Sequence, residues 1–223
     1  MKQDVVVIIG PTAVGKTKLS IEMAKVLNGE VINGDAFQVY KGLNIGTAKI
    51  TSEEAEGIPH HLIDIRDPHQ PYTVSNFQTD ARKAIQEIGA KGKLPILVGG
   101  TGLYISAVLY KNYQFKEAPE DPEYRAELEA YVQENGKEAL YTLLLDRAPH
   151  AAKKIHPNNV RRVIRALEKA REQSTVEDES KVQEKESLYN HIIVGLTMDR
   201  EPLYQRINNR VDKMVDEGLI EEA

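Results

Sequence analysis

The residues that most directly suggest chemistry form a glycine-rich loop near the start of the chain. An apolar run at residues 5–9 leads into GPTAVGKT at residues 10–17, which has the spacing G-x-x-x-x-G-K-T. The glycines of such a loop let successive backbone N–H groups point at one anion, and the following helix adds the positive end of its dipole. Lys16 would reach the outer phosphate oxygens, and the Thr17 hydroxyl would be a ligand for Mg²⁺. The motif therefore predicts a polyphosphate site without identifying the polyphosphate.

A second candidate is Asp35, which follows an expected strand at residues 30–33. The carboxyl ends of parallel strands surround the ligand in an α/β sheet, so Asp35 should lie near the phosphates. Its carboxylate suits a general base or a ligand of metal-bound water, and capping of the next turn is an equal alternative. A later strand ends in Gly99-Gly100-Thr101, where a flat substrate could approach the backbone and bond Thr101. A tight strand-to-helix turn is the simpler alternative there.

Two further loops carry polar side chains. Residues 42–49 are punctuated by glycines and hold two possible donors, Thr47 and Lys49, which favours a loop that faces the ligand. Residues 59–69 carry three histidines and two aspartates, but no two histidines stand four residues apart. We therefore favour a loop that packs near the site over a metal centre.

These candidates need a sheet to position them. Short apolar runs at residues 5–9, 30–33, 94–98 and 191–196 are typical of buried strands, and helical periodicity separates them. The pattern predicts an α/β fold, with a P-loop-type parallel sheet flanked by helices.

The character of the chain changes between residues 113 and 189, where strand-like runs disappear and charged helical segments take over. One such helix should begin at Asp121-Pro122 and stop at Asn135-Gly136. We predict a core of residues 1–112 and 190–223 with an inserted all-helical subdomain at 113–189. Basic residues in the insertion favour a phosphate-gripping patch over a solvated helix face. They are Lys153, Lys154, Arg161, Arg162, Arg165, Lys169 and Arg171.

Composition narrows the class of protein. The 223 residues carry a net charge of −5, which argues against a protein that coats nucleic acid non-specifically. No apolar run reaches membrane-spanning length and the first residues already begin a strand, so we expect no membrane segment and no signal peptide. The absence of cysteine leaves the cytoplasm as the default compartment. The helix that begins at residue 219 stops after one turn, which is typical of a truncated chain.

These motifs together resemble the tRNA dimethylallyltransferase family, whose members prenylate an adenosine next to the anticodon. The resemblance rests on GPTAVGKT at 10–17, NGDAFQVYKGLNIGTAK at 33–49, PHHLIDIRDP at 59–68, YTVSNF at 72–77, PILVGGTGLY at 95–104, IHPNNVRRVIRALE at 155–168 and REPLYQRINNRV at 200–211. It implies a core that binds dimethylallyl diphosphate with Mg²⁺ and an inserted domain that grips the tRNA anticodon stem-loop. It implies no protein partner, so we expect a monomer. The family has further helices beyond residue 223, and residues 169–187 match it poorly.

The resemblance also implies roles for individual residues. Asp35 would be the general base on the adenine N6 amine, with Lys16 and Thr101 as the other catalytic residues. The diphosphate would be held by Gly10, Thr12, Ala13, Val14, Gly15, Lys16 and Thr17, with Arg200 as an extra clamp and Thr17 as the metal ligand. The tRNA would contact Asp35, Ala36, Phe37, Gln38, Thr101, Asn159, Val160, Arg161, Arg162 and Val163.

Three other functions remain open from the residues. A P-loop kinase of a nucleotide or small metabolite would need a carboxylate after the third strand, where Gly99-Gly100-Thr101 stand instead. An isopentenyltransferase acting on free adenine nucleotide would not need the basic helical insertion. A non-catalytic RNA-binding module is disfavoured because Lys16, Thr17 and Asp35 are all present.

Overall fold

The computed structural model describes residues 2–100, 102–111, 121–172 and 186–223. The chain forms two compact units. The first comprises Met1–Phe115 and Glu184–Ala223, and the second comprises Lys116–Gln183. The second unit falls within residues 113–189, where we expected the helical insertion.

The first unit is built on a five-stranded sheet in the order β3-β2-β4-β1-β5, in which every pairing is parallel. The strands are β1 (Asp4–Ile9), β2 (Gly29–Asn33), β3 (His60–His61), β4 (Leu94–Gly99) and β5 (Asn190–Gly195). This confirms the predicted α/β fold with a parallel sheet. The expectation of a loop at residues 59–69 misses β3, whose two residues pair with Val31 and Ile32.

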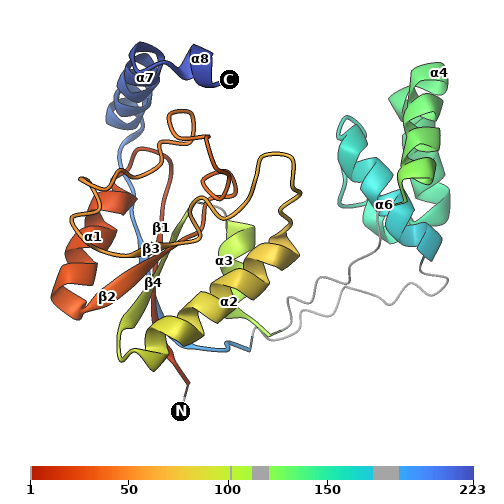
Figure 1. Cartoon of the computed structure of the whole chain (residues 1–223). Helices are drawn as coiled ribbons and strands as arrows, with labels where there is room; N and C mark the ends of the chain where they lie inside the picture. Colours follow the sequence, from red (N-terminus) through yellow and green to blue (C-terminus); the bar gives the residue numbers. More distant parts are fainter. Residues whose placement is uncertain (1, 101, 112–120, 173–185) are drawn as a thin grey trace. The chain divides into compact units, whose positions relative to one another are not determined.

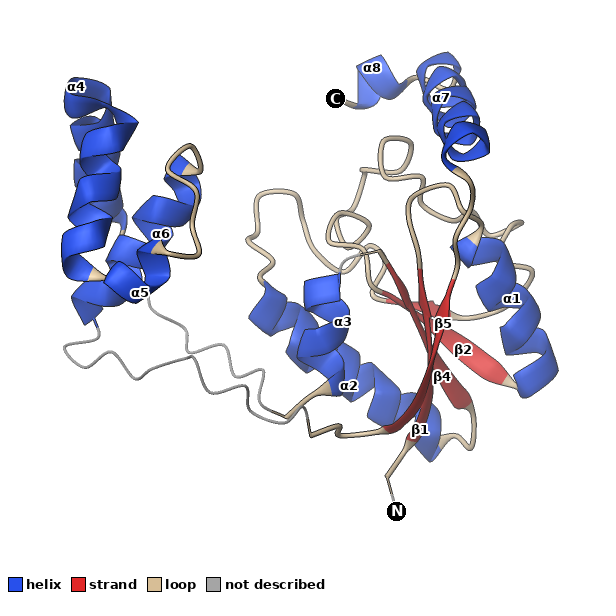
Figure 2. Ribbon diagram, turned by 180° about the vertical axis from the view of Figure 1, so that it is seen from behind, coloured by secondary structure: helices blue, strands red, loops and turns tan. Residues whose placement is uncertain are grey.

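Helices cover both faces of this sheet (Figure 1). Helix α1 (Lys16–Leu27) lies on one side, and α2 (Val74–Ala90) and α3 (Gly102–Leu109) lie on the other, as the view from behind also shows (Figure 2). Side chains alternate along a strand. Val5 and Val7 of β1 therefore pack against α2 and α3, while the intervening Val6 and Ile8 pack in the cluster on the α1 side. Burial on both faces explains why these strands are continuous apolar runs.

Two helices follow β5. Helix α7 (Arg200–Asp216) has no buried residue, and α8 (Leu219–Glu222) follows it after Gly218. Within the described part of the chain, no helix is both long enough and apolar enough to cross a membrane.

The second unit contains α4 (Pro122–Arg147), α5 (Pro149–Ala152) and α6 (Val160–Glu172). The predicted helix stop at Asn135-Gly136 corresponds to a break inside α4, where Gly136 has φ 83° and ψ 168°. The core joins Leu128, Leu140 and Leu144 of α4 to Val163 and Leu167 of α6. The unit thus has a hydrophobic core of its own.

A buried carboxylate ties together the end of the sheet at which the parallel strands begin. Glu30 lies at the start of β2 with 2% of its side chain exposed. It accepts from Lys93 (2.8 Å), Lys91 (3.2 Å) and the His61 ring (2.7 Å). Burial alone would raise the pKa of Glu30, but these hydrogen bonds outweigh it and hold the pKa at about 2. The charged carboxylate therefore links β2, β3 and the turn between α2 and β4.

Replacing Glu30 with glutamine should lower the free energy of unfolding at pH 7 by about 1–3 kcal/mol, because Lys91 and Lys93 lose a buried partner. A folded-state pKa below the ordinary value of 4.5 means that the unfolded state binds the proton more readily. The stabilisation is therefore present above pH 4.5 and is lost as pH falls toward 2. Urea unfolding of wild type and Glu30→Gln at pH 7 and pH 3 checks this. The difference in free energy of unfolding between wild type and Glu30→Gln should be smaller at pH 3 than at pH 7. Glu87→Gln, which changes an exposed ion pair, should unfold with the same free energy as wild type.

Candidate active site

The loop between β1 and α1 has the backbone of a phosphate cradle. Ala13 and Gly15 have positive φ values of 64° and 105°, which turn the chain sharply before α1 begins at Lys16. Gly10 lies against the end of β5, where a Cβ atom would stand 2.8 Å from the Leu196 carbonyl oxygen. A side chain at this position would displace the loop or the strand. The glycine therefore lets the loop sit directly over the end of the sheet.

A cavity of about 1170 Å³ opens above this loop. Its wall is formed by the phosphate loop, the C-terminal ends of β2 and β4, the loop at residues 44–51 and helix α7. Among the predicted site residues, it is lined by Gly10, Thr12, Ala13, Gly15, Lys16, Thr17, Asp35 and Gln38. Val14 is 8% exposed and packs in the interior, so it can offer only its backbone to a ligand. Thr101 lies outside the described residues.

Lys16 places its ammonium group at the mouth of the loop. Its Nζ donates to the carbonyls of Gly10 (2.9 Å) and Pro11 (2.7 Å). Burial and the nearby positive charge of Arg210 lower the pKa of Lys16, and the charge of Asp35 partly opposes this. Cationic groups from α1 and α7 therefore face the same space, an arrangement suited to a multiply charged anion.

Asp35 is held at the cavity wall by a short turn. Its Oδ1 accepts from the Phe37 N–H (2.8 Å), and its own N–H donates to Asn33 Oδ1 (3.2 Å). Asn33 is 8% exposed and its amide also donates to the Leu62 carbonyl (3.3 Å). The carboxylate thus caps a turn and faces the cavity at once, so the two interpretations of Asp35 are compatible. Phe37 is 64% exposed, and neither it nor Ala36 is among the described lining residues.

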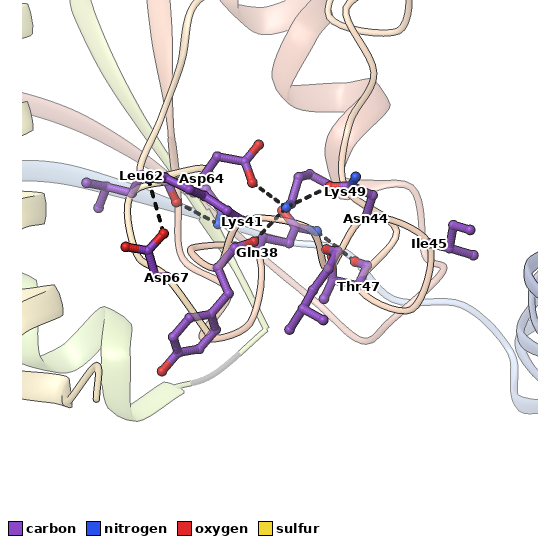
Figure 3. A network of polar contacts seen from close by, with 12 residues as sticks. Gln38, Lys41, Asn44, Ile45, Thr47, Lys49, Leu62, Asp64 and Asp67 are labelled. Atoms are coloured by element: carbon purple, nitrogen blue, oxygen red, sulfur yellow. Dashed lines mark hydrogen bonds and ion pairs between the residues drawn. The ribbon is translucent and has the colours of Figure 1, made fainter. Parts of the chain in front are cut away.

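The loop at residues 42–49 is braced from within (Figure 3). Lys49, whose side chain is 5% exposed, donates to Asp64 (2.6 Å), Asn44 (2.9 Å) and the Tyr40 carbonyl (2.7 Å). Thr47 donates to the Leu43 carbonyl (2.6 Å). Thr47 and Lys49 both line the cavity, as expected of a loop that faces a ligand, and their side chains are held by these hydrogen bonds. This network gives the cavity a firm wall.

Helix α7 supplies positive charge on the other side of the cavity. Arg206, Arg210 and Lys213 line it, since residues three and four apart share one helix face. Arg200 is not among the described lining residues, and its guanidinium lies 5.7 Å from the Tyr204 ring centroid. Arg200 sits at the first turn of α7, away from the stripe of residues that faces the loop. Arg206 and Arg210, rather than the predicted Arg200, are the α7 arginines that line the cavity.

The site's fit to Mg²⁺ depends on Thr17. Thr17 lines the cavity next to Lys16 in the sequence, and Asp35 lines the same cavity. Mg²⁺ keeps several waters and needs only one or two protein ligands beside phosphate oxygens, so a hydroxyl and a nearby carboxylate are a compatible donor set. Two of the three histidines of residues 59–69, His60 and His61, make other contacts. His60 Nδ1 lies 2.8 Å from the Ile58 carbonyl oxygen, and His61 pairs with Glu30.

Comparison with known proteins shows the family to which the chain belongs. The sequence model of the IPP transferase family matches residues 38–223. The chain belongs to the IPP transferase family. A relative from Anoxybacillus flavithermus, named tRNA dimethylallyltransferase, is 57% identical over 224 residues, which cover 100% of this chain and 70% of the relative. One of the same name from Bacillus subtilis is 52% identical, covering 100% and 71%.

Solved structures of IPP transferases share the fold. A tRNA isopentenylpyrophosphate transferase from Bacillus halodurans has a TM-score of 0.67 and 53% identity, over 99% of this chain and 69% of that chain. A eukaryotic dimethylallyltransferase, described as acting on tRNA, has a TM-score of 0.78 and 35% identity, over 99% and 55%. The resemblance stated from the motifs is thereby confirmed.

In this IPP transferase, the helical unit exposes only part of the expected RNA surface. Val163 is fully buried in the core of the unit, so its side chain cannot contact RNA. Asn159 caps the start of α6 by accepting from the Arg162 N–H (3.3 Å), and Val160 packs against the core. Arg161 and Arg162 are exposed. The contact predicted for residues 159–163 thus narrows to the outward-facing positions.

The predicted basic patch is also smaller than the sequence indicated. Glu168 is 3% exposed and accepts from Arg125 (2.7 and 3.1 Å) and Arg165 (2.8 Å). Arg171 pairs with Asp121 (3.1 Å). Acidic side chains therefore oppose Arg165 and Arg171 of the predicted patch. Six of the seven are exposed, namely Lys153, Lys154, Arg161, Arg162, Lys169 and Arg171, and Arg165 is partly buried.

The site residues of this IPP transferase that the sequence analysis missed come from two places. Asn33 accepts a hydrogen bond from the Asp35 N–H. A polar residue at the end of a strand with an apolar centre was the feature of the sequence that could have indicated this role. Arg206 and Arg210 are four residues apart on α7, so the sequence shows that they share one face of the helix. It does not show what that face lies against. Only the tertiary structure brings that face to the phosphate loop.

Proposed function

We propose that this protein is a tRNA prenyltransferase that moves a dimethylallyl group from dimethylallyl diphosphate to the N6 amine of the adenosine immediately 3′ of the anticodon. The main support for this proposal is that one cavity is lined by both the phosphate loop and Asp35. The similarity of the chain to tRNA dimethylallyltransferases also spans its full length. The products are N6-isopentenyladenosine and diphosphate. The kinase alternative is not favoured, because the relatives carry the prenyltransferase name.

In the proposed reaction, the bond between the allylic carbon and the diphosphate oxygen breaks while a bond from that carbon to N6 forms. Backbone N–H groups of the loop, Lys16 and the α7 cations stabilise the negative charge that grows on the leaving diphosphate. Mg²⁺, held by Thr17, would neutralise part of the same charge. Asp35 accepts the proton that N6 loses, which matters because conjugation with the ring makes this amine a poor nucleophile.

The anticodon loop is single-stranded, so its adenosine can be turned into the cavity at low cost. Phe37, exposed next to Asp35, offers an aromatic face on which the base can stack. In the helical unit, we assign RNA contact to Asn159, Arg161 and Arg162. These groups would bind phosphates, so they set affinity and its salt dependence more than base choice.

A label-transfer experiment separates the alternatives. The protein is incubated with undermodified tRNA and either prenyl-labelled dimethylallyl diphosphate or γ-labelled ATP. We expect prenyl label in the RNA, at the adenosine after the anticodon, and no transfer from ATP. Transfer of the γ-phosphate to a small molecule would instead establish the kinase. RNA binding without transfer of either label would indicate a binding module.

A further inference from the structure

Helix α8 is joined to the wall of the cavity by a carboxylate that the reaction does not use. Glu222 accepts from three successive backbone N–H groups of the loop at residues 44–46. Oε2 accepts from Asn44 (2.7 Å) and Ile45 (2.8 Å), and Oε1 accepts from Gly46 (2.8 Å). Successive N–H groups that converge in this way form an anion-binding concavity, and the carboxylate makes the bonds charge-assisted.

Apolar contact supports the same junction. A Cβ atom at Gly46 would stand 3.0 Å from Leu219 Cδ1, and one at Gly218 would stand 3.9 Å from Ile45 Cδ1. Burial opposes the charge of Glu222, but the N–H groups of Ile45, Gly46 and Asn44 outweigh it and lower the pKa of the carboxyl. Glu222 is therefore ionised near neutral pH. We call Glu222 with residues 44–46 the clasp.

The clasp connects two walls of the cavity. On one side, the loop carrying Asn44 and Ile45 is a firm wall, because Lys49 and Thr47 brace it. On the other side, α7 carries the cations at residues 206, 210 and 213. Helix α7 itself has no buried residue, so packing contributes little to its placement. The hydrogen bonds between Glu222 of α8 and the loop are therefore well placed to determine where the cations of α7 lie.

We propose that Glu222 is a positioning residue, which holds Arg206 and Arg210 over the phosphate loop and thereby raises the affinity of the cavity for a diphosphate. The proposal rests on the proposed function for the identity of the ligand class. Glu222 does not contact the ligand and acts through α7. Its loss should loosen α7 and leave the backbone of the phosphate loop unchanged.

The test compares Glu222→Gln with Glu221→Gln in the full chain. Glu221 is the exposed neighbour, so its change is matched in charge and position. Binding of inorganic pyrophosphate is measured by calorimetry, and KM and kcat for dimethylallyl diphosphate are measured with tRNA. For Glu222→Gln we expect pyrophosphate affinity to fall by about 5–20-fold, in the lower range of coupling between separate sites, and KM to rise with it. Glu221→Gln should stay within about twofold of wild type.

A second background distinguishes positioning from general stabilisation. If Glu222 acts through the α7 cations, Glu222→Gln should have little further effect on pyrophosphate affinity in the Arg206→Ala, Arg210→Ala variant. The same loss in both backgrounds, or an unchanged affinity in the single variant, would overturn the proposal. Pyrophosphate binding does not require transfer to RNA. Failure of the transferase assay with an intact Glu222 effect would therefore count against the proposed function alone.

Discussion

Replacing Asp35 with asparagine is expected to slow prenyl transfer by about 10²–10⁴-fold, the range for loss of a general base. Asparagine keeps a side-chain oxygen where Asp35 Oδ1 accepts from the Phe37 N–H (2.8 Å), so the turn at the cavity wall should survive. What is lost is the ability to take the proton from N6. The defect should therefore appear in the rate constant of the chemical step, measured by single-turnover transfer of labelled prenyl groups to tRNA, and in kcat measured at steady state.

Binding measurements complete the Asp35 experiment. Pyrophosphate and tRNA should bind Asp35→Asn with affinities within about twofold of wild type, because the phosphate loop and the helical unit are unchanged. Asp67→Asn is the matched control, since Asp67 is an exposed carboxylate paired with Lys41. A loss of pyrophosphate binding in Asp35→Asn would show a metal-binding or folding role instead. An unchanged kcat would remove Asp35 from the proposed mechanism.

Replacing Lys16 with methionine is expected to lower kcat/KM by about 10²–10³-fold, comparable to removing one donor from a site that stabilises developing negative charge. Lys16 Nζ lies among the carbonyls of the phosphate loop, and its pKa is lowered by burial and by Arg210. A diphosphate bound next to Lys16 would compensate the positive charges of Lys16 and Arg210. Loss of the Lys16 ammonium group should therefore weaken both pyrophosphate binding and the chemical step.

The matched control for Lys16 is Lys83→Met, at a 73% exposed lysine on α2. It should leave kcat/KM and pyrophosphate affinity unchanged. Calorimetry with pyrophosphate and the transfer assay check both variants. If Lys16→Met keeps wild-type affinity and rate, the loop motif does not hold the diphosphate as proposed. If it loses pyrophosphate binding but unfolds at a lower temperature as well, Lys16→Arg tests whether charge at this position restores binding.

Local patterns in the chain were sufficient for much of this description. The motif at residues 10–17 predicted the cradle because its glycines and its lysine act through backbone geometry within one short segment. The strands at residues 5–9 and 94–98 were legible because burial on both faces demands continuous apolar residues. Asp35 could be placed near the cradle because parallel strands end at the same edge.

Other features depended on contacts between residues far apart in the chain. Val163 is part of an exposed-looking basic motif, yet it is fully buried, because the turn of α6 decides which positions face the core. Arg165 pairs with Glu168 within one turn of α6, whereas Arg171 pairs with Asp121 only because the fold brings α6 to the start of α4. Lys49 lines the cavity, as expected of a loop that faces a ligand, and the fold also brings Asp64 to it. The pairings of Arg171 with Asp121 and of Lys49 with Asp64 have no signature in local spacing.

By itself, then, the sequence determined the parallel α/β core, the phosphate loop, the place of Asp35 and the family, since each follows from residues close together or from motifs in order. Only the tertiary structure decided which cations of α7 line the cavity. Arg206 and Arg210, rather than Arg200, line the cavity because α7 presents one face to it, and Glu222 joins that helix to a loop more than 170 residues earlier. Charge acts through space, so its partners are chosen by the fold.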